Sequence, residues 1–86
     1  MPNAKFLIEA THRSITAEHF KEDGKFMIWY HKAGKYDYDH SIGFVQVRGI
    51  KEPLTEDELK THIDKMIERA YRKRTKNESI NKLNLS

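Results

Sequence analysis

The sequence contains no cysteine, and this absence excludes two ways of stabilising a small protein. Neither a disulfide framework nor a thiolate metal site can supplement the core, and nothing indicates an oxidising compartment. The chain has 86 residues, which is enough for one domain with one sheet and one or two helices. Its stability must therefore come from packing.

Long apolar runs are also missing. No run approaches the roughly 18–20 residues that are needed to span a bilayer, and the N-terminal residues 1–5 lack the charged-then-apolar layout of a signal peptide. We therefore expect a cytoplasmic protein that has no membrane partner.

The local motifs of most catalytic or cofactor sites are absent from the sequence. No serine has the glycine-flanked elbow setting of a nucleophile, and no glycine-rich loop is present to cradle a phosphate. His12, His19 and His62 fall at unrelated positions. We predict that the protein is not an enzyme and uses no cofactor, with acid–base chemistry by His31 or His40 as the enzymatic alternative.

One segment is rich in metal-ligand types, because it contains Asp37, Asp39 and His40. In a strand, alternation places the two aspartates on one face and His40 on the other, so at most His31 of the neighbouring strand joins them. No metal site is predicted. We expect a cross-strand pair between His31 and Asp37 instead.

The clearest local signal is the start of a helix at residues 55–58. Thr55 can accept from the backbone N–H of Glu58, and the Glu58 carboxylate can reach back to the N–H of Thr55. Leu54 and Leu59 flank this capping box and can pack across the first turn. This pattern predicts a capped amphipathic helix.

A buried stripe continues along this helix at helical spacing and is expected to cover the sheet. Its members are Leu59, Ile63, Met66, Ile67, Ala70 and Tyr71. The domain is expected to span residues 1–76, and the polar segment 77–86 to be a flexible or docking tail.

The charge is distributed unevenly along this helix, although the formal net charge is only +3. The acidic end carries Glu52, Glu56, Asp57 and Glu58. The basic end carries Lys65, Arg69, Arg72, Lys73, Arg74 and Lys76. The order matches the partial charges of the helix ends and leaves excess positive charge at one tip.

Three segments are rich in β-compatible residues: 6–10, 25–32, and a third that follows a turn at 33–35 and continues to residue 47. We expect 6–10 to be a central strand because both of its faces carry apolar groups. With 33–35 as the loop, the predicted pairs are Tyr30 opposite Tyr38, Ile28 opposite His40 and Phe26 opposite Ile42.

Residues 14–24 allow two interpretations. Asp23 and Gly24 suit either the end of a helix or a two-residue hairpin turn. A hairpin would mix apolar and charged groups on one face, because Phe20 would pair with Met27 and Glu18 with Trp29. A short helix over residues 17–23 is therefore preferred.

These elements predict an α+β fold: a three-stranded, mostly antiparallel sheet with a short helix after the first strand and a long C-terminal helix packed on one face. Three strands followed by a C-terminal helix resemble the layout of several small DNA-binding domains, including the arm-binding domains of tyrosine recombinases. The resemblance is architectural and includes no sequence motif.

The basic helix end indicates a binding protein whose partner is nucleic acid or a nucleoprotein. Arg69, Arg72, Lys73 and Arg74 would contact phosphate, and Trp29 or Tyr38 would stack on bases. Lys65 and Lys76 belong to the same predicted binding surface. The alternative is a stoichiometric inhibitor or adaptor that recognises an acidic protein surface, as small accessory proteins of mobile elements do.

Overall fold

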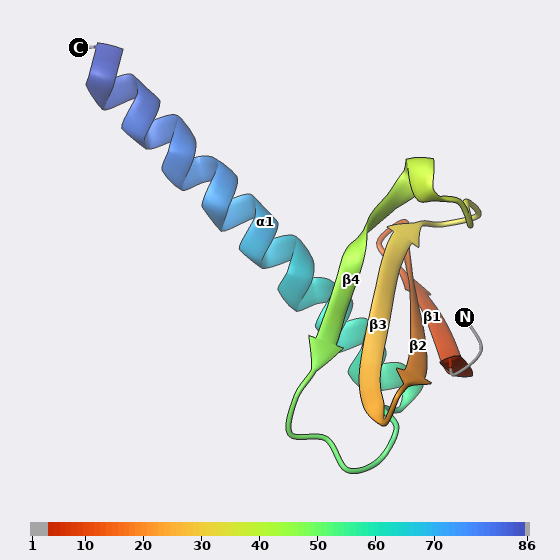
Figure 1. Ribbon diagram of the computed structural model, residues 1–86. Coiled ribbons are helices and arrows are strands. Elements are labelled where there is room, and N and C mark those ends of the chain that lie inside the picture. The colour runs from red at the N-terminus through yellow and green to blue at the C-terminus, as the bar shows by residue number, and fades with distance from the viewer. Residues whose placement is uncertain (1–3, 86) are drawn as a thin grey trace.

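The computed structural model describes the backbone of residues 4–85 and the side chains of residues 4–72 (Figure 1). The fold is α+β, as predicted, with an antiparallel sheet and one C-terminal helix. Its elements are β1 (Ala4–His12), β2 (Ile15–Glu22), β3 (Lys25–Lys32), the 3-10 helix η1 (Tyr38–His40), β4 (Ser41–Val47) and α1 (Glu56–Leu85).

The sheet has four strands in the order β1-β2-β3-β4, and each strand is antiparallel to its neighbour. The prediction of three strands is therefore wrong, and so is the short helix over 17–23, because these residues belong to β2. Asp23 and Gly24 both have positive φ, 50° and 78°, as the two central residues of a tight hairpin turn require.

The pairs that argued against this hairpin are the ones that form. Phe20 lies opposite Met27 and Glu18 lies opposite Trp29. The mixture of apolar and charged groups is tolerated because this face of the sheet does not pack on α1. Sequence alternation alone does not reveal which face a helix covers.

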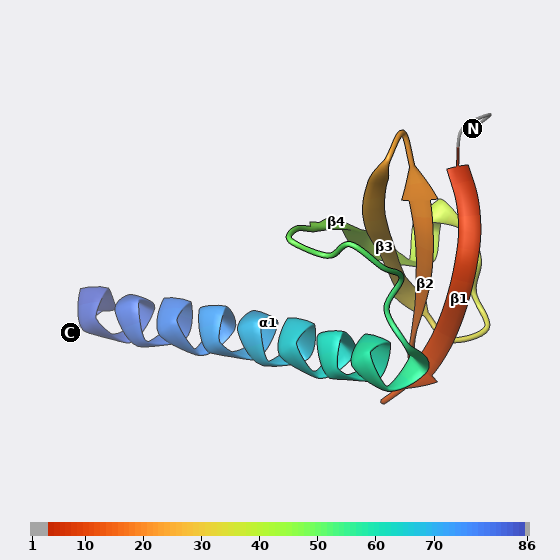
Figure 2. The ribbon, with the colours of Figure 1, turned by 90° about the horizontal axis from the view of Figure 1, so that it is seen from below.

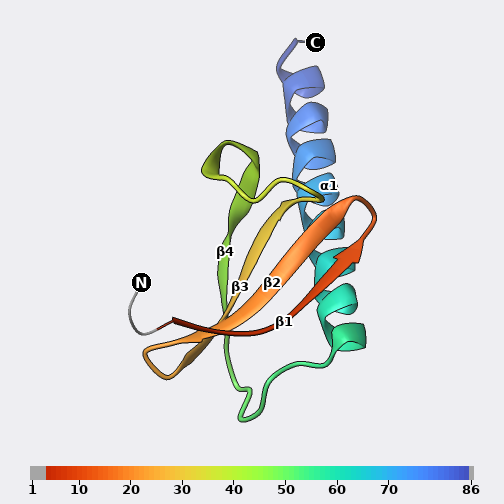
Figure 3. The same ribbon diagram turned by 90° about the vertical axis from the view of Figure 1, so that its right-hand side faces the viewer.

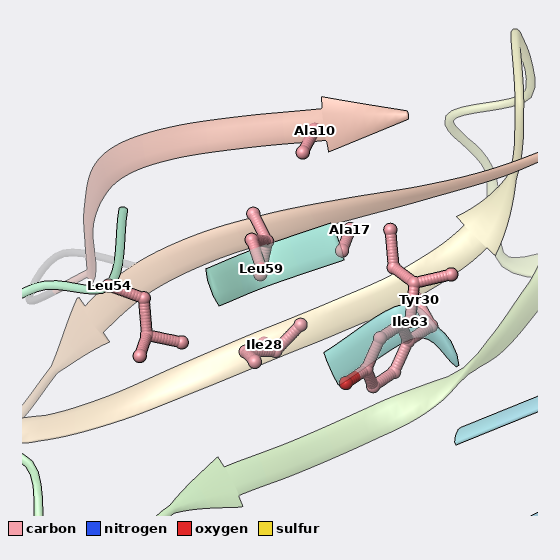
Figure 4. Packing of buried hydrophobic residues seen from close by; sticks show 7 residues of the cluster. All are labelled: Ala10, Ala17, Ile28, Tyr30, Leu54, Leu59 and Ile63. Carbon is pink, nitrogen blue, oxygen red and sulfur yellow. The ribbon is translucent and has the colours of Figure 1, made fainter. Parts of the chain in front are cut away.

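Side chains on the other face form the core against α1, and Figure 4 shows Leu59 and Ile63 of the helix among the side chains of the strands. The fully packed members are Ala10, Ala17, Ile28, Tyr30, Leu54, Leu59 and Ile63. We call this face of the sheet the covered face and the opposite one the open face. Figures 2 and 3 show α1 on the covered face only.

β1 is an edge strand that pairs only with β2, so the prediction of a central first strand is wrong. A β-bulge between Phe6 and Ile8 shifts the register. Ile8 packs against the core, whereas Phe6 pairs with Phe20 on the open face and is mostly exposed. Apolar residues on both faces of this strand therefore do not mean that both faces are buried.

The register between β3 and β4 also differs from the predicted one. The observed pairs include Tyr30 opposite Gly43, Ile28 opposite Val45 and Phe26 opposite Val47. The connection is longer than three residues because the carboxylate of Asp37 accepts from the backbone N–H of His40 at 3.0 Å and caps η1. Ser41, not Asp37, lies opposite His31.

The predicted start of α1 is confirmed. The backbone N–H of Thr55 donates to Oε1 of Glu58 at 3.1 Å, and the N–H of Glu58 donates to Oγ1 of Thr55 at 3.3 Å. Leu54 and Leu59, on either side of this capping box, are both buried in the core. Three local interactions therefore fix where the helix begins.

α1 leaves the sheet after its first few turns, and Figures 1 and 2 show its C-terminal part projecting away from the strands. Met66 and Ile67 still pack against the core, but Ala70 is exposed and Tyr71 is 71% exposed. The predicted buried stripe is thus too long by one turn. The backbone stays helical to Leu85, and the predicted tail 77–86 lies outside the residues whose side chains the structure describes.

Candidate functional site

Three of the predicted cations have described side chains, and they lie where α1 leaves the sheet. Lys65, Arg69 and Arg72 are exposed and occupy successive turns of the helix. The other three predicted cations lie outside the described side chains: Lys73, Arg74 and Lys76. The structure therefore places half of the predicted basic end.

Two of these cations line a groove between α1 and the β3–β4 edge of the sheet, with a volume of about 410 Å³. We call it the basic groove. Its basic side chains are Arg48, His62, Lys65 and Arg69. Its other lining residues are Tyr30, Val45, Gln46, Val47 and Met66. Arg48 is the first residue after β4, whereas Lys65 and Arg69 belong to α1. Two segments that are distant in sequence therefore contribute positive charge to one groove.

The pKa values of the groove residues indicate that its positive charge at neutral pH is carried by arginine and lysine. Burial and the nearby Lys65 ammonium lower the pKa of His62 below its usual value, so this imidazole is neutral near pH 7. Burial raises the pKa of the Tyr30 phenol, and the Arg69 guanidinium partly opposes that change. The groove therefore offers a neutral phenol and fixed cations.

The carboxylates of the described part of the chain leave these cations largely unneutralised. No ion pair joins Lys65 or Arg69 to a described carboxylate, whereas Arg72 pairs with Glu68 at 3.7 Å. Both side chains of that pair are exposed to solvent, so the ion pair is weak. The positive charge of the groove is available to a ligand.

The two aromatic residues predicted to stack on bases do not join the cations. Trp29 lies on the open face, since its neighbour Tyr30 packs in the core of the covered face. Its indole N–H donates to Oγ of Ser41 at 2.8 Å, and its ring stacks on Phe44 with centroids 5.6 Å apart. Tyr38 is 82% exposed on η1, in the loop between β3 and β4.

The predicted pair between His31 and Asp37 is wrong. Asp37 instead contacts His40, with 2.7 Å between Oδ1 and Nδ1, and the hydrogen bond from the His40 side chain holds the pKa of Asp37 below its usual range. The carboxylate near His31 is Glu18, at 3.6 Å. Within residues 4–72, no group of three or more acidic or histidine side chains is arranged to hold a metal ion.

Sequence reasoning missed two features of these surfaces. Arg48 follows β4 and is separated by about 20 residues in sequence from the helix cations, so only the β4 register reveals it. The contact between Glu18 and His31 crosses from β2 to β3, and the preference for a helix over 17–23 concealed it. No local sequence pattern predicts either the position of Arg48 in the groove or the contact between Glu18 and His31.

The register of the sheet sorts charged residues by face. Lys5 pairs with Lys21, which pairs with Phe26, so all three belong to the covered face. Glu9 pairs with Glu18 on the open face. The strands therefore place these two lysines on the covered face, and the open face is acidic around the middle of β1 and β2.

Comparison with models of protein families, with curated proteins and with solved structures finds no match to this chain. Among the helical residues that the structure describes, none form a helix long and apolar enough to cross a membrane. A function for the protein is therefore inferred from the chemistry of its surfaces.

Proposed function

We propose that this chain is a small, non-enzymatic binding or regulatory protein that contacts nucleic acid, or a nucleoprotein, through the cations where α1 leaves the sheet. The observation that carries the proposal is the basic groove, in which Arg48, Lys65 and Arg69 come together from two segments. Exposed arginine and lysine neutralise phosphates and release counterions, which makes such binding salt-dependent.

The geometry of α1 supports a long anionic ligand. Lys65, Arg69 and Arg72 follow one another on consecutive turns, about 4.5–6 Å apart along the helix axis. The helix continues beyond the sheet to Leu85 (Figure 1). A phosphate backbone lying along this projecting helix therefore meets one cation after another.

The same surface predicts weak dependence on base sequence. Phosphate contacts position a protein on nucleic acid but do not read its bases. Trp29, the aromatic residue best suited to stacking, lies on the other side of the sheet from Lys65 and Arg69. Binding through the groove should therefore tolerate changes of base composition.

The alternative function is that of a stoichiometric inhibitor or adaptor that recognises an acidic protein surface. Val45, Val47 and Met66 line the groove beside the cations. Apolar side chains next to arginine are typical of protein interfaces, whereas a phosphate backbone makes little use of them. This observation favours the alternative.

A binding titration at two salt concentrations separates the two functions. Labelled single- and double-stranded DNA and RNA are titrated with the protein at about 50 and 200 mM salt. The proposal predicts binding to at least one of them that weakens steeply at the higher concentration. The absence of salt-sensitive binding to all four nucleic acids contradicts the proposal. A separate pull-down that recovers one acidic protein at fixed stoichiometry supports the alternative.

A further inference from the structure

The open face of the sheet is a second surface, with a charge opposite to that of the basic groove. Glu9 and Glu18 lie directly opposite each other on β1 and β2. No described lysine or arginine forms an ion pair within 4 Å of either carboxylate, and the imidazole of His31 lies 3.6 Å from Glu18. Two like charges placed opposite each other destabilise a sheet unless something else compensates them.

Beside these carboxylates, aromatic rings form a row across β2, β3, β4 and the loop between β3 and β4. Phe20 contacts Phe44 edge-on at 6.2 Å, and Phe44 stacks on Trp29. His31 lies between Trp29 and Tyr36, with centroid distances of 4.4 and 4.8 Å. Phe44 is 46% exposed, so the row is a surface and not a second core.

The buried end of this row holds a polar atom without a hydrogen-bond partner, Nε2 of His31. Nδ1 of His31 faces the carbonyl oxygen of Lys32 at 3.1 Å and must therefore carry the proton that is donated there. Nε2 is buried and has no hydrogen-bond partner. The 3.6 Å between this atom and Oε2 of Glu18 is longer than a hydrogen bond, so Glu18 receives no donor from His31.

An ionised carboxylate is thus held at the edge of an aromatic surface without a donor of its own. Partial burial raises the pKa of Glu18, which His31 opposes and the facing Glu9 reinforces. A cation placed here compensates both carboxylates, and the neighbouring rings attract the same cation through their negative faces. Few other ligands combine these two requirements.

We propose that the open face is a docking site for a cationic segment of a partner protein. An arginine or lysine of the partner pairs with Glu9 and Glu18 and lies beside the rings of Trp29 and Phe44. His31 is a positioning residue, because it is buried between Trp29 and Tyr36 and fixes the surroundings of Glu18.

Charge complementarity identifies this occupant. A phosphate backbone is repelled by Glu9 and Glu18, whereas the arginine and lysine side chains of a partner protein are attracted to them. The proposal stands independently of the basic groove, because the two surfaces lie on opposite faces of the sheet. A protein with both surfaces can hold an anionic partner on one face and a cationic partner on the other.

Trp29 is the only tryptophan of the chain, so its fluorescence reports on the open face directly. The probe is a peptide of alternating arginine and glycine, which contains no aromatic residue. We expect a saturable change of Trp29 emission in the full-length protein. Replacing both carboxylates, Glu9→Gln with Glu18→Gln, should weaken the affinity about tenfold, and Phe44→Ala should weaken it about threefold.

A matched variant carries changes on the other face, Lys65→Gln with Arg69→Gln. It should bind the peptide within about twofold of the wild-type affinity while losing affinity for nucleic acid, so failure of one proposal is distinguishable from failure of the other. Circular dichroism establishes that each variant is folded.

Three results overturn the proposal. They are the absence of a saturable emission change with the peptide, equal affinity of the folded Glu9→Gln/Glu18→Gln variant, and quenching of Trp29 by nucleic acid, which would place bases on the open face. Sedimentation equilibrium adds a fourth: self-association that is weakened by the two glutamate changes assigns the face to a second copy of this chain.

Discussion

The backbone N–H of Leu54 donates a hydrogen bond to Nε2 of His19 at 3.1 Å, and both residues are buried. Nδ1 of the same ring lies 3.0 Å from the carbonyl oxygen of Met27. A carbonyl only accepts, so the ring is neutral with its proton on Nδ1. One imidazole therefore joins β2 and β3 to the segment that leads into α1, and it orients the helix that carries the cations.

Replacing the imidazole of His19 should destabilise the fold. His19→Ala leaves the N–H of Leu54 without an acceptor and opens a cavity, so we expect the free energy of unfolding to fall by about 2–4 kcal/mol. Urea denaturation measures the change. His40→Ala, in the exposed loop, should cost less than about 1 kcal/mol, and equal losses for the two variants would contradict the role assigned to His19.

The capping box of α1 should make the stability of the fold depend on pH in the acidic range. Hydrogen bonds from the backbone and then the hydroxyl of Thr55 lower the pKa of Glu58 from its usual 4.5. Since the folded pKa is the lower one, ionised Glu58 stabilises the fold above pH 4.5, and this contribution is lost as the pH falls through the folded pKa.

Denaturation of the wild type and of Glu58→Gln over a series of acidic pH values tests this. The wild type should lose stability more steeply on acidification than the variant. Glu56→Gln, which changes a carboxylate of the same helical turn outside the capping box, should keep the wild-type steepness. Parallel pH profiles for wild type and Glu58→Gln would show that the capping hydrogen bonds do not form.

Glu18 should behave in the opposite way. Burial raises its pKa above the usual 4.5, so the ionised form is disfavoured by folding and its charge lowers stability at neutral pH. Glu18→Gln should therefore raise the melting temperature at pH 7, and the difference should shrink as the pH falls toward 4.5. A lower melting temperature for the variant would mean that Glu18 serves stability and not binding.

The hairpin turn between β2 and β3 depends on Gly24, which has a φ of +78°. A Cβ at this position would meet no neighbouring atom, so substitution costs only backbone strain. Gly24→Ala should lower the free energy of unfolding by about 1–2 kcal/mol. Gly24→Asn should cost less, because asparagine tolerates this conformation, and a larger loss for asparagine would contradict the turn geometry.

The sequence predicts the start of α1 because every signal there is local. Thr55, Glu58, Leu54 and Leu59 interact within one turn, so their spacing is enough to place the helix end. The cations of the helix are likewise predicted by their proximity in sequence. Their solvent exposure follows from the departure of α1 from the sheet after Ile67.

The sheet could not be predicted to the same extent, because its register depends on contacts between distant residues. The pairing of Glu18 with Trp29 looked unfavourable until the structure placed both on a face without a helix. η1, which Asp37 caps, lies in the connection between β3 and β4, and this longer connection shifts every pair of the two strands from the predicted register. Arg48 and the Glu18–His31 contact follow from these registers and were missed with them.

The proposed use of the basic groove is tested most directly by the salt dependence of nucleic-acid affinity. Affinities of the wild type and of Lys65→Gln/Arg69→Gln are measured by fluorescence anisotropy over a series of salt concentrations. If each cation neutralises one phosphate, the slope of log affinity against log salt should be about two units shallower for the double variant. Equal slopes and equal affinities for the two proteins would show that the groove does not contact nucleic acid.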